Sequence, residues 1–119
     1  MRQQHSHAAC IEACQHCFQT CLAAADGHCL EVAGDHAAPA HLRLMHDCAD
    51  ICQLSAAFML RRSTFHPRTC ALCAEVCIAC AADCEALGDE VMRECATICR
   101  RCAESCRVMV AAHAATDRS

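Results

Sequence analysis

Cysteine is the residue type that dominates the chemistry available to this 119-residue chain. Sixteen cysteines are present, and all but one follow steps of three or four residues. Three segments share the spacing C-x3-C-x2-C-x3-C: Cys10, Cys14, Cys17 and Cys21; Cys73, Cys77, Cys80 and Cys84; Cys95, Cys99, Cys102 and Cys106. A partial fourth copy reads Cys48, Cys52, Ser55 and Met59, and Cys70 precedes Cys73. Because thiolates prefer soft metal ions, this spacing predicts a metal-binding protein.

Histidines and methionines extend the cysteine rows in the same register. Those we expect to add metal ligands at one end are His7, Met59, His66, Met109 and His113. A second group, expected at the opposite end, consists of His28, His41, Met45 and Met92. We assign the remaining cysteine, Cys29, to a loop and leave it outside the ligand set.

Steps of three and four residues place side chains on one face of an α-helix. At about 100° per residue, each group of four falls within an arc of roughly 60°. We expect helices at about residues 4–25, 39–62, 67–87 and 89–114, within one domain spanning 1–119. Asp26-Gly27 and Gly88 predict helix ends, and Pro39 and Pro67 predict first turns.

Four helices with short connections predict an all-α fold, an antiparallel up-down-up-down four-helix bundle with a cysteine-lined core. Its facing residues should form four layers. We expect them to be Cys10, Met59, Cys73 and Cys106; Cys14, Ser55, Cys77 and Cys102; Cys17, Cys52, Cys80 and Cys99; and Cys21, Cys48, Cys84 and Cys95.

Composition argues against several other classes of function. The net charge is −4, and the ten basic residues, all arginine, are scattered among fourteen acidic ones, so nucleic acid is not an expected partner. No apolar run approaches the roughly 20 residues of a membrane span. No nucleophile with an activating base stands out, which indicates a binding protein rather than an enzyme. The N-terminal residues lack a secretory signal, so we expect a cytoplasmic protein with reduced thiols.

The choice of metal follows from the ligands. Zinc is usually held in a tetrahedron, whereas Cu(I) is content with two or three sulfurs, which suits paired cysteines on a straight helix. Buried thiols should be neutral before metal arrives, and each Cu(I) can displace one proton. About one copper per thiol keeps the core neutral, so we expect on the order of 10 to 20 Cu(I) per chain. A thiol-based redox protein, an iron-sulfur electron-transfer protein and a zinc buffer remain alternatives.

Two other interpretations of the cysteines are weaker. A secreted disulfide scaffold would be richer in turns than a chain with three glycines and two prolines. The spacing C-x3-C-x2-C also matches the cluster motif of radical enzymes that cleave S-adenosylmethionine. Here it occurs three times within expected helices, in a chain too short for the barrel of those enzymes.

The repeated cysteine rows resemble those of the bacterial copper storage proteins, in particular their cytosolic branch. The resemblance implies Cu(I) storage by cysteine pairs inside a bundle, entry at a mouth with methionine or histidine, and a homotetramer. It also implies the ligands, by motif position: Cys10, Cys14, Cys17, Cys21, Cys48, Cys52, Cys70, Cys73, Cys77, Cys80, Cys84, Cys95, Cys99, Cys102 and Cys106. Copper ions are the expected partners, with a copper chaperone as a candidate for delivery. The second helix departs from the pattern, because it carries only two cysteines.

Overall fold

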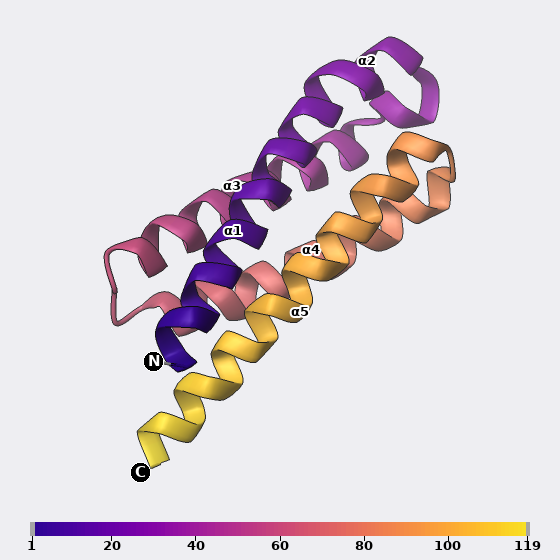
Figure 1. Cartoon of the computed structure of the whole chain (residues 1–119). Coiled ribbons are helices and arrows are strands. Elements are labelled where there is room, and N and C mark those ends of the chain that lie inside the picture. The colour runs from indigo at the N-terminus through magenta and orange to yellow at the C-terminus, as the bar shows by residue number, and fades with distance from the viewer. Residues whose placement is uncertain (1, 119) are drawn as a thin grey trace.

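The computed structural model describes residues 2–118, with side chains for residues 7–115. Its long helices are α1 (Arg2–Ala23), α3 (Pro39–Leu60), α4 (His66–Leu87) and α5 (Glu90–Arg118). They alternate in direction, and each packs against two neighbours: α1 against α3 and α5, and α4 against α3 and α5 (Figure 1). The chain is therefore an antiparallel four-helix bundle, measuring 51 × 21 × 20 Å. Within the described residues, no helix is both long and apolar enough to cross a membrane.

Proline and glycine set several of the helix ends as expected. Pro39 lies in the first turn of α3, directly after Ala38, whose backbone is extended. Pro67 lies in the first turn of α4. That helix ends at Gly88, which has φ 79° and donates its backbone N–H to the carbonyl of Cys84. This left-handed conformation favours glycine because any Cβ would be strained there.

The first helix does not end at Asp26-Gly27, so that prediction is wrong. A single π-helical turn, η1 (Ala24–His28), continues α1 into the short helix α2 (Cys29–Val32). The backbone N–H of Cys29 bonds to the carbonyl of Ala24, five residues earlier. A π-turn takes up one more residue than an α-turn. Cys29, eight residues after Cys21, is therefore turned back towards the core instead of lying in a loop.

The connection after α2 contains a strained residue. Ala33 has φ 62° and ψ −159°, and Gly34 follows with φ 58° before the 3-10 turn η2 (Gly34–Ala37). This region of backbone space is nearly restricted to glycine. The segment from α2 to η2 and the turn between α4 and α5 lie together at the end of the bundle remote from both termini (Figure 1).

The layers predicted between α1 and α5 agree with the structure at three levels. The sulfur of Cys106 lies 3.7 Å from that of Cys10, and the sulfur of Cys102 lies 3.6 Å from that of Cys14. Cys17 lies 3.8 Å from Cys99.

The layers predicted between α3 and α4 are wrong by about one helical turn. Cys52 lies 3.6 Å from both Cys73 and Cys77, not beside Cys80. Cys48 lies 3.7 Å from Cys77, and the position opposite Cys84 is taken by Met45. Because α3 ends at Leu60 and α4 starts at His66, the turn is centred near Ser63, and each residue of α3 faces an earlier residue of α4 than expected.

Candidate metal centre

The interior of the bundle is made of sulfur and small side chains. All sixteen cysteines are free and buried, each with at most 1% of its surface exposed. Among the other buried positions, alanine is the commonest residue: Ala24, Ala25, Ala49, Ala56, Ala74, Ala81, Ala96 and Ala103. Alanine favours the helix and lets neighbouring helices approach closely, which brings the sulfurs of different helices together.

Most of the sulfurs form one connected network through the core. Cys52 links α3 to α4 and α5, because its sulfur lies 3.8 Å from that of Cys102 and 3.6 Å from those of Cys73 and Cys77. Cys48 likewise lies 3.8 Å from Cys21 and 3.9 Å from Cys17 and Cys99. The sulfurs form overlapping groups that could each hold an ion, among them Cys10, Cys70 and Cys106; Cys14, Cys73, Cys102 and Cys106; Cys52, Cys73, Cys77 and Cys102; Cys17, Cys48, Cys52 and Cys77; and Cys17, Cys21, Cys48 and Cys99.

These separations match those of sulfurs that share a metal ion. With metal–sulfur bonds of about 2.3 Å, two sulfurs lie about 3.8 Å apart at a tetrahedral ion and about 4.0 Å apart at a trigonal one. The observed hydrogen-bonded sulfur pairs of the core lie 3.6 to 3.9 Å apart. The sulfurs of the metal-free core therefore already have the spacing that a shared ion requires.

Burial keeps isolated thiols protonated. It raises the pKa of Cys95 to about 12, because the charged thiolate loses its hydration. Inside the network, hydrogen bonding divides the thiols into donors and acceptors. Hydrogen bonds with Cys10 and Cys102 raise the pKa of Cys106, and the hydrogen bond from Cys106 lowers the pKa of Cys102. A cation that binds a protonated thiol has to displace its proton.

One end of the bundle gathers His7, His66, His113 and Met59, and we call it the histidine end. The rings of His7 and His66 meet edge to face at 4.9 Å, and those of His66 and His113 at 5.5 Å. His7 Nε2 and His66 Nδ1 are buried without a hydrogen-bond partner among the described residues. A cavity of about 1030 Å³ lies against all four side chains. Desolvation lowers the pKa of His66, and its two histidine neighbours lower it further.

The remaining predicted ligand, Met109, continues the row of cysteines on α5. Met109, one turn beyond Cys106, is buried with 3% of its surface exposed. All the cysteines of the expected ligand set, and the histidines and methionines expected at this end, therefore lie in the core or at the histidine end.

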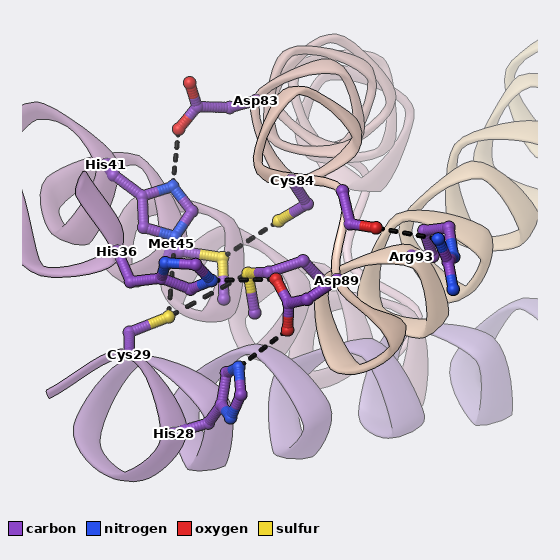
Figure 2. Close-up of polar contacts among 11 residues, drawn as sticks. His28, Cys29, His36, His41, Met45, Asp83, Cys84, Asp89 and Arg93 are labelled. Carbon is purple, nitrogen blue, oxygen red and sulfur yellow. Dashed lines mark hydrogen bonds and ion pairs between the residues drawn. The ribbon is translucent and has the colours of Figure 1, made fainter. Parts of the chain in front are cut away.

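The opposite end holds the expected donors His41, Met45 and Met92 together with Cys29, which the sequence analysis leaves outside the ligand set. The sulfur of Cys29 lies 3.5 Å from Nε2 of His41, a contact drawn as a dashed line in Figure 2. The same sulfur lies 3.9 Å from Sδ of Met92. Met45 lies 3.4 Å from the sulfur of Cys84 and 3.5 Å from that of Cys80. The sequence pattern places Cys29 in a loop because Asp26-Gly27 predicts a helix end, whereas η1 carries the helix past these two residues. Its distance of eight residues from Cys21 was the available signal.

His28 was expected among these donors but is engaged elsewhere. Asp89, at the start of α5, accepts hydrogen bonds from His28 Nε2 at 2.8 Å and from His36 Nε2 at 2.7 Å (Figure 2). Hydrogen bonding by His36 and then His28 lowers the pKa of Asp89 to about 2. This carboxylate ties the α1–α3 connection to the α4–α5 turn.

A four-helix bundle with a continuous interior of free thiols defines a class of proteins that bind soft metal ions. The family model described as copper storage protein matches residues 3–111. The chain therefore belongs to the copper storage protein family.

Solved structures show the same fold over nearly the whole chain. A protein from Nitrosospira multiformis is 52% identical, with a TM-score of 0.86, over 91% of this chain and 97% of the other. The Cu(I)-bound copper storage protein BsCsp3 of Bacillus subtilis is 39% identical, with a TM-score of 0.82, over 88% and 98%. A cytosolic copper storage protein from Streptomyces lividans, solved with five coppers, is 33% identical, with a TM-score of 0.78, over 92% and 95%.

A curated relative matches a shorter segment. The cysteine-rich protein YhjQ of Bacillus subtilis is 40% identical over 75 residues. The match covers 63% of this chain and spans 62% of the length of YhjQ.

Proposed function

We propose that the protein stores many Cu(I) ions on the thiols that line its bundle, and so protects its surroundings from free copper and holds the metal for later use. The observation that carries this proposal is the connected network of buried, free sulfurs with separations of 3.6 to 3.9 Å. Family membership and the copper-bound relatives support the same cargo. In this proposal the protein is not an enzyme, because its function is binding and release.

Charge supports a high capacity. The described core contains no lysine or arginine beside the thiols, so incoming metal is the main source of positive charge for ionised thiols. Each Cu(I) that replaces one thiol proton leaves the core neutral, whereas a few ions among many thiolates would leave costly buried charge. With Cys29 included, one copper for each of the sixteen cysteines falls within the order of 10 to 20 ions that ligand chemistry suggests.

An anaerobic Cu(I) titration of the reduced chain against a competing chelator tests the proposal. Thiolate-to-copper absorption in the ultraviolet should rise until more than ten ions are bound per chain, by the same one-per-thiol estimate. Saturation at one or two ions would rule out storage. Zinc bound beforehand should be displaced, and a brown iron-sulfur protein would favour the electron-transfer alternative.

The histidine end supports a role in copper entry. Buried imidazole nitrogens of His7 and His66 have no hydrogen-bond partner among the described residues, and Met59 lies against the same cavity. Neutral imidazole and thioether can bind Cu(I) transiently before the ion reaches Cys10, Cys70 and Cys106. In this proposal, the residues that bind Cu(I) transiently during entry are His7, His66, His113, Met59 and Met109.

Location and assembly belong to the same proposal. The Streptomyces lividans relative is a cytosolic protein, which supports a cytosolic location here. Exposed Leu54, Leu72 and Val108 can seal contacts between bundles, which supports the homotetramer that the family resemblance implies. Light scattering after gel filtration should give about four times the chain mass of 12.8 kDa. A copper chaperone is the proposed delivery partner.

A further inference from the structure

The end of the bundle opposite the histidine end presents donors of three different types. Cys29 contributes a thiol from α2, His41 an imidazole nitrogen from α3, and Met92 a thioether from α5. Cys29 and Met92 are fully buried, and His41 has 5% of its surface exposed. None of these residues belongs to the sulfur groups described above for the core.

The hydrogen bond between His41 and Asp83 fixes which imidazole nitrogen can bind a metal. Nδ1 of His41 lies 2.5 Å from a carboxylate oxygen of Asp83 on α4 (Figure 2). A carboxylate only accepts hydrogen bonds, so Nδ1 carries the ring proton. In the neutral ring, Nε2 then presents its lone pair, and it does so towards the sulfur of Cys29. Metal-binding histidines are commonly held by a carboxylate in this way.

The separations already suit a bound ion. With metal–sulfur and metal–nitrogen bonds of about 2.3 and 2.0 Å, sulfur and nitrogen lie about 3.5 Å apart at a tetrahedral ion and about 3.7 Å apart at a trigonal one. Two sulfurs lie about 3.8 and 4.0 Å apart in the same two geometries. The observed distances are 3.5 Å from Cys29 to His41 and 3.9 Å from Cys29 to Met92.

We propose that Cys29, His41 and Met92 form a separate site for one Cu(I) ion, distinct from the thiolate core, at the end remote from the histidine end. On binding, the thiol proton of Cys29 is released and the thiolate neutralises the ion, so the occupied site is uncharged. Burial raises the pKa of Cys29 to about 11, so the thiol holds its proton until metal arrives. Zinc fits less well, because one thiolate would leave a dication only half neutralised.

The site gives the bundle a second place for copper exchange. His41 lies between the buried Cys29 and Asp83, whose side chain is 42% exposed. On the inner side, Met45 and Cys84 lead towards the core. A site with one thiolate should bind Cu(I) less tightly than sites with bridging thiolates, and so exchange it more readily. This inference rests on the proposed function only in taking Cu(I) as the cargo.

Nitrogen-15 NMR of the histidine-labelled, reduced full chain during an anaerobic Cu(I) titration tests the site. Cu(I) is diamagnetic, so the Nε2 resonance of His41 should move upfield as it changes from a free lone pair to a ligand. His46 provides an internal control, because its Nε2 is held 2.8 Å from Asp26 at the surface and should not move. Ultraviolet absorption recorded in parallel measures filling of the core.

Two variants complete the design. Cys29→Ser should abolish the His41 shift and lower the copper capacity by about one ion per chain, because a hydroxyl is a poor ligand for Cu(I). Cys70→Ser removes a thiol near the histidine end and should keep the His41 shift. An unmoved His41 resonance with a filled core would overturn this site and leave storage intact. A His41 shift without core absorption would support the site and overturn storage. Persistence of the shift in Cys29→Ser would also overturn the site.

Discussion

The sulfurs of Cys52 and Cys73 lie 3.6 Å apart across the α3–α4 interface. Cys52 is one of only two cysteines on α3, yet it also lies within 3.8 Å of Cys77 and Cys102. A helix with few thiols therefore contributes to the most connected part of the core.

Cys52→Ser should reduce copper capacity more than its single lost thiol suggests. The thiol belongs to two of the four-sulfur groups, so both lose a ligand. We expect a loss of about one to two Cu(I) per chain, since one ion is expected per thiol. Anaerobic titration measures the change. Cys95→Ser is the matched control, with an expected loss of one ion or fewer, and an equal or larger loss there would contradict the special position of Cys52.

Ser55→Cys should improve both the metal-free protein and its capacity. The hydroxyl oxygen of Ser55 is fully buried and has no hydrogen-bond partner among the described residues. Replacing it with a less polar thiol should raise the free energy of unfolding by about 1 kcal/mol. The added thiol should bind about one more Cu(I). Chemical denaturation and copper titration check the two effects, and a destabilised variant would show that the site has no room for sulfur.

The buried histidine His66 should make the metal-free protein less stable in mild acid. Its folded pKa lies below the ordinary value of 6.5, so below that pH the unfolded chain binds the additional proton. The contribution of neutral His66 is complete above about pH 6.5 and is lost as pH falls. In His66→Gln the melting temperature should depend less on pH between 5 and 7. His16→Gln, at an exposed position, should keep the wild-type profile.

Asp89 should stabilise the far end of the bundle except in strong acid. Its pKa is lowered to about 2 by His36 and His28, so its contribution is present above the ordinary pKa of 3.8 and is lost as pH falls towards 2. Asp89→Asn should lower the melting temperature near pH 6, and the difference from wild type should shrink below pH 4. Asp50→Asn, on the exposed face of α3, should have little effect at either pH.

Ala33→Gly should stabilise the protein. The backbone of Ala33 has φ 62° and ψ −159°, a conformation that costs a residue with a Cβ about 1 to 3 kcal/mol. Part of this gain is offset because glycine loses more conformational entropy on folding, so we expect a net gain of about 1 kcal/mol. Ala40→Gly, within α3, should instead lose about 1 kcal/mol. Denaturant-induced unfolding of both variants measures whether each substitution raises or lowers the free energy of unfolding.

The fold was predictable because cysteine spacing, proline and glycine agreed on the same four helices. The spacing of three and four residues could arise only on a helical face, and Pro39 and Gly88 marked boundaries that the structure shows. The register of α3 against α4 was not predictable in the same way. It depends on how tightly the chain turns at Ser63, and nothing in the regular pattern of cysteines specifies that.

The cysteines of the core were predictable from the sequence. The prediction was incomplete at the end of the bundle that holds Cys29. The spacing of the other cysteines does not predict that Cys29 lies in the core. A π-turn changes the helical period for a single turn, and regular spacing does not reveal such a change. The pairing of His41 with Asp83 joins residues 42 positions apart, so it depends on the same unpredicted register.

The position of α5 has a consequence for the order of events during synthesis. This helix packs against both α1 and α4 and supplies Cys99, Cys102 and Cys106 to the network. Until α5 has left the ribosome, the other long helices leave one side of the core open. Their thiols are then accessible to oxidants and to metal ions in the surroundings. A closed core for copper therefore forms only after α5 has been synthesised.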